Sequence, residues 1–483
     1  MSESAAFLAA ASALLGERGL TTDADLLSPW LTDWRGRYSG NALALASPAS
    51  TAEVSGLVKL CGEYGIPIVP QGGNSGMSGG ATPDDSGNAI ILSLRRMNRI
   101  RKFAPVERKI TCEAGMVLQS LHDAVEAEGL RFPLTLGGKG SATIGGLIST
   151  NAGGTQVLRH GTMRAQVLGL EAVLADGSVF DALATLKKDN RGFDLKQLLI
   201  GSEGTLGIVT AATLRLLPAL TARTVLWAGL DDIRTARKLL LHAEARIGDA
   251  LEGFEVMPLH CHDAVLSHIP SARSPLSGRH EWHVLIELVA DKDSADALPA
   301  KAASLLESAF ASGLVEDATI AANEAQAQAF WNLRDDISGA ERALGPAVQH
   351  DIAVPVEKMA DFVAQTVPDV EATFPGTKAF GFGHLGDGNV HFHVLAPPNV
   401  EATRWYDTDG KAISAFVHDA VARWNGTISA EHGIGQMKVE ELARLADPVR
   451  LALMQTIKQA LDPQNILNPG KLVPQLALSN RSG

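Results

Sequence analysis

Histidines gather in residues 381–395, which read GFGHLGDGNVHFHVL. Apolar residues alternate with histidines from Val390 onward, so His391 and His393 are expected on one face of a strand. The Gly-Asp-Gly-Asn segment predicts a hairpin that brings His384 beside His391. Two imidazoles there suit a divalent metal with a third ligand from elsewhere, but histidines bonded only to backbone would leave the same pattern.

The same stretch contains a literal GxGxxG, from Gly381 to Gly386. A dinucleotide-binding fingerprint requires a strand before it, a helix after it and an acid about 20 residues further on. A second strand is expected here in place of the helix. A nicotinamide cofactor is therefore not predicted.

Length and charge narrow the class of protein. A chain of 483 residues is too long for one core and predicts two or three domains. A formal net charge of -12 without a basic block argues against a nucleic-acid partner. The cysteines Cys61, Cys112 and Cys261 have no CxxC spacing, so neither an iron–sulfur cluster nor a disulfide framework is predicted.

The N-terminal stretch MSESAAFLAAASALLGERGL is expected to form an amphipathic helix. Glu3 precedes its apolar run without a Lys or Arg, which is the wrong polarity for a signal peptide, and Glu17 disfavours a transit peptide. No apolar run approaches the 18 residues or so of a membrane span. A cytoplasmic location is therefore expected.

Three glycine-rich stretches, 70–81, 137–154 and 190–210, lie among short expected strands such as 66–69 and 110–115. Glycine lets backbone N–H groups approach an anion closely, as in phosphate-binding loops. One such stretch alone is more typical of a plain turn. Three of them favour a long phosphorylated cofactor bound across one α+β domain.

Seven segments in chain order resemble the FAD-linked D-2-hydroxyacid dehydrogenases, and among these the D-2-hydroxyglutarate dehydrogenases. They are PQGGNSGMSGG, PLTLGGKGSATIGGLISTNAGG, VLGLEAVLADG, KDNRGFDLKQLLIGSEGTLGIVT, GFGHLGDGNVHFHV, SAEHGIGQMK and LDPQNILNPGKL. The resemblance implies an α+β fold, with a vanillyl-alcohol-oxidase/PCMH-type FAD-binding domain, a ferredoxin-like α/β substrate domain and a C-terminal helical segment that returns to the FAD site. These three parts are expected over residues 1–218, 219–415 and 416–483, respectively. A repeated βαβ pattern expected over residues 224–319 agrees with the second.

The resemblance also implies which residues hold FAD. Relatives with covalent flavin often place a histidine where this chain has Asn74, so non-covalent FAD is expected. The implied cofactor residues are Pro70, Gly72, Gly73, Asn74, Ser75, Gly76, Gly79, Gly80, Gly138, Ser141, Gly145, Gly146, Ser149, Asn151, Gly154, Glu203, Gly204, Ile208 and Asn468.

For the substrate, the resemblance points to Arg334, on an expected helix 323–344, because a forked guanidinium suits a carboxylate. Asn389 and Ser338 are further implied contacts, Ser338 standing where a threonine is usual. Gln349 stands where a lysine is usual and His393 where an asparagine is usual. A distal carboxylate would therefore meet less positive charge here than in relatives that keep the lysine.

Glu431 and His432, in SAEHGIGQMK, complete the expected chemistry. A carboxylate plus His384 and His391 is a common open site for a divalent ion, here expected to be zinc. Such an ion would lower the pKa of a substrate hydroxyl, and His432 would accept its proton, although a histidine that only caps a turn is the alternative. Hydride transfer to flavin is favoured over carbanion chemistry.

The expected reaction is thus oxidation of a D-2-hydroxy acid, D-2-hydroxyglutarate first, to the 2-oxo acid. D-Lactate or glycolate dehydrogenation is the alternative, supported by the missing lysine, and a direct oxidase is a weaker third. A non-catalytic protein is disfavoured, because structural zinc is normally held by four protein ligands. The implied electron acceptor is external, namely electron-transfer flavoprotein, a quinone or a cytochrome, and a homodimer is left open.

Overall fold

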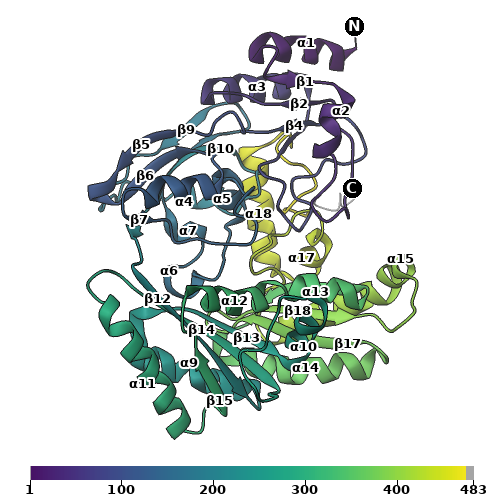
Figure 1. The fold of residues 1–483 in the computed structure, drawn as a ribbon. Helices are drawn as coiled ribbons and strands as arrows, with labels where there is room; N and C mark the ends of the chain where they lie inside the picture. The colour runs from purple at the N-terminus through teal and green to yellow at the C-terminus, as the bar shows by residue number, and fades with distance from the viewer. Residues whose placement is uncertain (1, 475–483) are drawn as a thin grey trace. The chain divides into compact units, whose positions relative to one another are not determined.

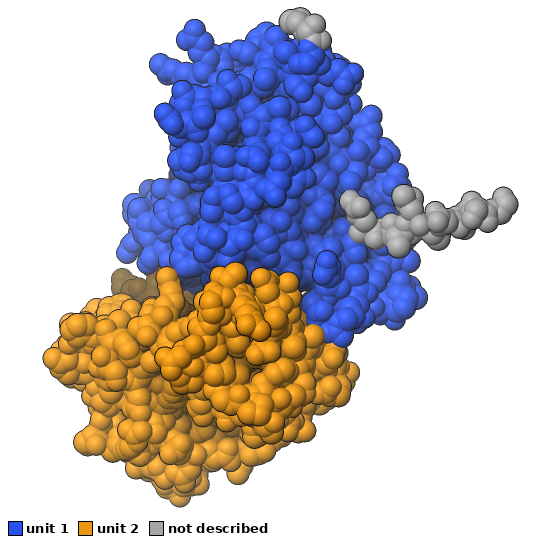
Figure 2. All heavy atoms as spheres, turned by 90° about the vertical axis from the view of Figure 1, so that its right-hand side faces the viewer, with its two compact units in different colours: residues 1–154, 161–218, 431–483 blue, residues 155–160, 219–430 orange. Residues whose placement is uncertain are grey.

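The computed structural model describes residues 2–474, which divide into two compact units (Figure 2). Within this range, unit 1 holds residues 2–154, 161–218 and 431–474, and unit 2 holds 155–160 and 219–430. Residues 416–430, expected in the C-terminal segment, thus belong to unit 2. In the described range, no helix is long and apolar enough to cross a membrane.

Unit 1 is built on two main sheets, with strand orders β1-β2-β4-β3 and β5-β6-β10-β8-β9 (Figure 1). The first sheet pairs β2, β4 and β3 in parallel, whereas the second is antiparallel throughout. The strands are β1 Leu20–Thr21, β2 Ala44–Ala46, β3 Ile68–Pro70, β4 Ile90–Leu92, β5 Ile100–Ala104, β6 Lys109–Glu113, β7 Leu130–Arg131, β8 Val167–Val173, β9 Val179–Ala182, β10 Ile208–Arg215 and β11 Leu217–Pro218. The helices are α1 Glu3–Leu15, α2 Ala24–Leu27, α3 Thr51–Tyr64, α4 Leu118–Glu126, α5 Ile144–Thr150, α7 Met163–Gln166, α8 Lys196–Leu199, α17 Val439–Leu445 and α18 Pro448–Leu461.

Local signals fix the ends of α3, the helix that leads into the first glycine loop. The Ser50 side chain accepts the N–H of Glu53, and the Glu53 carboxylate accepts the N–H of Ala49 at 2.8 Å. These bonds satisfy N–H groups that a helix start leaves unpaired. The helix ends at Gly65, whose φ of 64° is left-handed and suits glycine.

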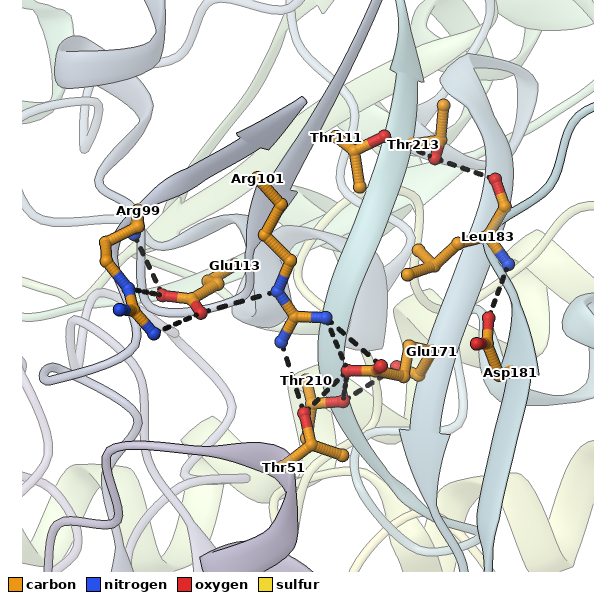
Figure 3. Close-up of polar contacts among 10 residues, drawn as sticks. All are labelled: Thr51, Arg99, Arg101, Thr111, Glu113, Glu171, Asp181, Leu183, Thr210 and Thr213. Atoms are coloured by element: carbon orange, nitrogen blue, oxygen red, sulfur yellow. Dashed lines mark hydrogen bonds and ion pairs between the residues drawn. The ribbon is translucent and has the colours of Figure 1, made fainter. Parts of the chain in front are cut away.

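A buried polar network joins α3 to the second sheet (Figure 3). Arg101 of β5 contacts Glu113 of β6 at 3.3 Å and Glu171 of β8 at 3.0 Å. The hydroxyls of Thr51, at the start of α3, and of Thr210 on β10 each donate to Glu171 at 2.7 Å. The Glu171 carboxylate of β8 thus links this strand to α3, β5 and β10. Buried polar groups whose hydrogen bonds are satisfied in this way favour a single arrangement of these segments.

Unit 2 begins with a ferredoxin-like motif, as expected. Its strands and α-helices run β12, α9, β13, α10, β14, α11 and β15, and its four strands lie in the order β15-β12-β14-β13, after which β17, β18 and β16 extend the sheet to seven strands. The strands are β12 Ala222–Leu230, β13 Leu251–Pro258, β14 Trp282–Ala290, β15 Asp317–Ile320, β16 Ala347–Ala353, β17 Lys378–His384 and β18 Asn389–Leu395. The helices are α6 Val157–His160, α9 Ile233–Ile247, α10 Leu259–His268, α11 Leu298–Ala311, α12 Glu324–Asp335, α13 Ile337–Leu344, α14 Met359–Thr373, α15 Ala402–Trp405 and α16 Lys411–Arg423.

Helices cover both faces of this sheet (Figure 1). Side chains of α9, α11, α14 and α16 pack with Phe254, Ile286 and Phe392 on one face, which we name the α14 face. Side chains of α10, α12 and α13 pack with Trp227 and Phe382 on the other, the α12 face. Residues directly opposite one another on neighbouring strands point to the same face of a sheet. His391, which pairs with Phe382, therefore also lies on the α12 face.

The expected helix 323–344 is two helices, α12 and α13, that meet at Asp336. The asparagine at position 323 caps α12 by accepting the N–H of Gln326 at 3.0 Å. Both Trp331 and Arg334 lie in α12, and each bonds to a glutamate of the sheet, Trp331 to Glu287 and Arg334 to Glu255. Both side chains therefore face the sheet.

Candidate functional site

A cavity in unit 1 is lined by residues from all three glycine-rich stretches. A Cβ at Gly73 would lie 1.8 Å from the carbonyl oxygen of Ser141, and one at Gly72 would lie 2.4 Å from Oγ1 of Thr143. A Cβ cannot approach backbone so closely, so Gly73 requires glycine, and a Cβ at Gly72 would displace the Thr143 side chain. The first loop, after β3, can therefore lie directly against the second, before α5, and the cavity opens beside their contact.

Most of the implied cofactor residues line this cavity, namely Pro70, Gly72, Gly73, Asn74, Ser75, Gly76, Gly80, Gly145, Gly146, Ser149, Glu203, Gly204 and Ile208. The others, Gly79, Gly138, Ser141, Asn151, Gly154 and Asn468, stand outside the lining. Two of these hold the loops in place. The Asn468 side chain donates to the carbonyls of Gly80 at 2.9 Å and Glu203 at 2.8 Å, and Oδ1 of Asn151 accepts the N–H of Arg164 at 2.9 Å.

The sequence reasoning missed Ser93, Leu94 and Arg95, which also line the cavity. The Arg95 guanidinium lies over the ring of Trp30, 5.2 Å from its centroid. These residues directly follow β4, which pairs in parallel with β2 and β3. Ligands of open parallel sheets bind at the carboxyl ends of strands. The position of these residues directly after a parallel strand could therefore have identified them from the sequence.

Glu203 and Ser78 fasten the segment around His432 to the glycine loops. The Glu203 carboxylate accepts the N–H groups of Ile434 and Gly435 at 2.7 Å each. Burial raises the pKa of Glu203, and these two hydrogen bonds oppose the rise. The Ser78 hydroxyl contacts the carbonyl of His432 at 3.2 Å. His432 thereby becomes part of the cavity wall.

In unit 2 the histidine hairpin forms as predicted. β17 and β18 pair antiparallel, with Phe382 opposite His391 and His384 opposite Asn389. The apolar partners Val390, Phe392 and Val394 are buried on the α14 face, so His391 and His393 lie on the α12 face. The rings of His384 and His391 are 5.6 Å apart between centroids and nearly perpendicular.

Glu255 of β13, which the sequence reasoning missed, contacts two of the predicted site residues. Its Oε1 lies 2.5 Å from Nδ1 of His384, and its Oε2 accepts from Nε of Arg334 at 2.8 Å. Burial of this carboxylate favours its neutral form, but the charges of His384 and Arg334 outweigh burial and hold the pKa of Glu255 at about 2. In the sequence, this residue could have been singled out as a glutamate within the apolar strand pattern LEGFEVM.

Arg334 and His391 share the ring of Phe382. The guanidinium carbon of Arg334 lies 5.1 Å from the centroid of this ring, and the His391 ring lies 5.2 Å from it. Burial, followed by the charges of Arg334 and His384, lowers the pKa of His391 well below its usual value. A neutral imidazole is the form that binds metals.

At the neighbouring position along β18, His393 meets a second glutamate that the sequence reasoning missed. Nδ1 of His393 lies 2.6 Å from Oε2 of Glu341, a residue of α13, and the Gln349 amide donates to the same oxygen at 3.4 Å. The rings of His393 and Phe382 are 5.0 Å apart. Phe382 thus lies close to both Arg334 and His393.

The remaining implied substrate residues have other surroundings. The Asn389 side chain is buried and donates to Asp351 at 3.0 Å and to the carbonyl of Ile352 at 2.9 Å. Ser338 is exposed on α13, and its carbonyl accepts from Arg342 at 3.3 Å. Glu431 is the residue at which the chain re-enters unit 1. His384 and His391 thus lie in unit 2, whereas Glu431 belongs to unit 1.

Comparison with known proteins identifies both halves of the chain. The family model for the C-terminal domain of FAD-linked oxidases matches residues 220–472, and the model for an FAD-binding domain matches residues 42–182. The chain is 41% identical over 466 residues to a probable mitochondrial D-2-hydroxyglutarate dehydrogenase of Oryza sativa subsp. indica, covering 96% of this chain and 81% of the relative. It is 38% identical to the mitochondrial D-2-hydroxyglutarate dehydrogenase of Bos taurus, covering 94% and 81%.

Among solved structures, p-cresol methylhydroxylase with substrate bound matches with a TM-score of 0.76 at 16% identity, over 99% of this chain and 98% of that one. This likeness concerns the fold and confirms the expected PCMH-type architecture. The expectation of a cytoplasmic location is wrong, because the similar proteins of rice and cattle are named mitochondrial.

Proposed function

We propose, because the chain belongs to the FAD-linked oxidase family together with the D-2-hydroxyglutarate dehydrogenases, that it oxidises D-2-hydroxyglutarate to the 2-oxo acid. That it is an FAD-linked dehydrogenase follows from the family. The observation that supports this substrate class is the placement of Arg334, His384 and His391 on one face of the unit 2 sheet around Glu255 and Phe382. An anion-binding guanidinium beside two imidazoles suits a 2-hydroxy carboxylate.

FAD, when bound, would supply the acceptor for a hydride from C2 of the substrate. The residues that would hold it are the glycine-loop residues, Ser149, Glu203 and Ile208 around the unit 1 cavity. Gly72 and Gly73 line the cavity without side chains, which suits a phosphorylated cofactor that backbone N–H groups would approach. Asn74 lines the same cavity, and its amide donates to the carbonyl of Thr32 at 2.8 Å, so no nucleophile stands at the position where relatives attach flavin covalently.

A divalent metal, zinc in our proposal, would be held by His384, His391 and Glu431 and would lower the pKa of the substrate hydroxyl. The donor set fits such an ion. With Nδ1 of His384 engaged by Glu255, Nε2 is the atom that a metal would use, which is the usual carboxylate–histidine arrangement at metal centres. His391 is held neutral by its surroundings, as a ligand must be.

The protein's own residues then divide the work. Arg334 binds the carboxylate of the substrate and is itself oriented by Glu255 through a 2.8 Å ion pair. His432, in the wall of the cofactor cavity, accepts the hydroxyl proton at a ring nitrogen. Glu203 and Ser78 hold the His432 segment in position. Electrons leave to an external acceptor, which we propose to be electron-transfer flavoprotein, a quinone or a cytochrome.

D-Lactate or glycolate is the second candidate substrate, and the observation that favours it is the Glu341 carboxylate beside Gln349 and His393. These shorter acids carry no second carboxylate that would have to lie against this cluster. The comparison with named relatives favours the five-carbon diacid.

Anaerobic addition of D-2-hydroxyglutarate to the FAD-loaded protein is expected to bleach the flavin absorbance. Pretreatment with a strong chelator should abolish this bleaching, because the hydroxyl proton is then not acidified, while the flavin stays bound and the melting temperature changes little. Adding back zinc should restore it. A protein that unfolds on chelation has a structural metal, and failure of every D-2-hydroxy acid to bleach the flavin contradicts the proposed function.

Acid precipitation of the holoprotein is expected to release all of its flavin into the supernatant. Asn74 offers no side chain that forms a stable bond to the isoalloxazine ring. The measurement is the flavin absorbance of supernatant and pellet, with a covalent flavoprotein as the control. Yellow colour that remains in the pellet would show that another residue attaches the cofactor.

A further inference from the structure

Unit 1 contains a second cavity, of about 260 Å³, which we name the Ser47 cavity. Ser47, directly after β2, lines it together with Gly19, directly before β1. These residues adjoin because β1 and β2 pair antiparallel, and the N–H of Ser47 donates to the carbonyl of Gly19 at 2.7 Å. The cofactor cavity is lined by residues that follow β3 and β4 of the same sheet. Both cavities therefore lie at carboxyl ends of parallel strands, where such sheets bind ligands.

The Ser47 hydroxyl is a buried polar group in the wall of this cavity. Ser47 is only 1% exposed, and its Oγ has no hydrogen-bond partner among the described residues. Its backbone carbonyl, in contrast, accepts from the guanidinium of Arg96 at 2.8 Å. Because a buried hydroxyl without a partner is unfavourable, a polar group of a ligand in the cavity would complete its hydrogen bonding.

Two arginines of the lining, Arg18 and Arg95, form no ion pair with another described residue. The Arg95 guanidinium lies over the Trp30 ring, 5.2 Å from its centroid, and the Trp30 carbonyl accepts from Gln71 at 2.9 Å. This stacking restricts the positions of the guanidinium, so that less entropy is lost when it binds an anion. A planar guanidinium can bind a carboxylate through two parallel hydrogen bonds.

The rest of the lining limits the charge and size of a ligand. Glu17 is the only acid in the lining, so the two arginines leave a net formal charge of +1, which suits a monoanion. Leu20, Leu26 and Leu45 add apolar surface. The volume is below the roughly 300–1,000 Å³ of pockets that hold drug-sized molecules, so the ligand must be small.

We propose that the Ser47 cavity binds a small monocarboxylate with a short apolar chain, and that this ligand competes with FAD for Arg95. The carboxylate is bound by Arg18, Arg95 and the Ser47 hydroxyl, and the apolar chain packs against the leucines. This ligand is additional to FAD and to the 2-hydroxy acid. Arg95 lines both cavities, and two anions that depend on one guanidinium weaken each other by the same factor.

Isothermal titration calorimetry of the FAD-loaded protein with butyrate tests the site, because butyrate is a short monocarboxylate without the hydroxyl that oxidation requires. Arg18→Gln is expected to weaken butyrate binding about tenfold, and Ser47→Ala about fivefold, as is typical for the loss of a charged and of a neutral donor. Arg215→Gln is the matched control, because this exposed arginine lines neither cavity, and it should keep the wild-type dissociation constant.

Inorganic phosphate, which has no apolar chain, should bind more weakly than butyrate. Binding of phosphate as tight as that of butyrate would overturn the assignment of a carboxylate with an apolar chain. Absence of butyrate binding to wild type, or equal binding by wild type and both cavity variants, would overturn the site itself. None of these measurements depends on turnover of a 2-hydroxy acid.

The shared arginine gives a second readout. The dissociation constant of FAD, measured by dilution of the holoprotein and the rise in flavin fluorescence, should increase about fivefold at saturating butyrate. Arg18→Gln should shift this effect to higher butyrate concentrations, whereas Arg215→Gln should not. An FAD dissociation constant that does not change with butyrate would overturn the competition for Arg95.

Discussion

Replacing His432 by alanine is expected to lower the rate of flavin reduction by D-2-hydroxyglutarate by about 10²- to 10⁴-fold, the usual effect of removing a positioned acid–base group. The physical reason is the position of this residue in the wall of the cofactor cavity, where Ser78 holds its backbone and Glu203 holds the next residues. The measurement is stopped-flow bleaching of the flavin under anaerobic conditions, so that reoxidation does not limit the rate.

His432→Gln is the companion variant, because glutamine retains hydrogen bonding but accepts no proton at neutral pH. It should be nearly as slow as the alanine variant. Flavin content and the spectrum of the bound cofactor should match wild type in both. Near-normal bleaching combined with slow steady-state turnover would remove His432 from the proton-transfer step and place its effect on reoxidation.

Replacing Glu255 by alanine is expected to lower the free energy of unfolding of unit 2 by about 3–5 kcal/mol, as is typical when one partner of a buried ion pair is removed. The carboxylate is 1% exposed and contacts both Arg334 and His384, whose side chains are 11% and 9% exposed. Its loss leaves the guanidinium in a poorly solvated position. The measurement is differential scanning calorimetry together with urea unfolding of the holoprotein.

Asp263→Asn is a matched control in the same unit. Asp263 forms a 2.8 Å ion pair with Arg279, but the two side chains are 39% and 71% exposed, so its loss should change stability by no more than about 1 kcal/mol. Glu255→Gln should be intermediate in stability, and it should raise KM, because Arg334 loses an ionic partner. Equal stability losses for Glu255→Ala and Asp263→Asn would show that the Glu255 contacts do not stabilise unit 2.

The hairpin of histidines and the glycine loops were predictable from sequence because their signals are local. Alternation of Val390, Phe392 and Val394 with His391 and His393 specifies both the strand and the face on which each side chain lies. A Cβ at Gly73 would collide with the backbone of Ser141, and one at Gly72 with the side chain of Thr143. The resemblance over seven motifs added the predictions of the FAD cofactor, of the fold and of the family.

Only the tertiary structure showed what accompanies the predicted residues. Glu255 is 129 positions from His384, Glu341 is 52 positions from His393, and Glu203 is 231 positions from Ile434. In the sequence, each of these residues can be recognised only as an acid. Its partner is determined by the order of strands in the sheet or by the contact of the C-terminal segment with the glycine loops. Local backbone preference acts over a few residues, whereas the pairing of buried charges is decided by which distant segments the fold brings into contact.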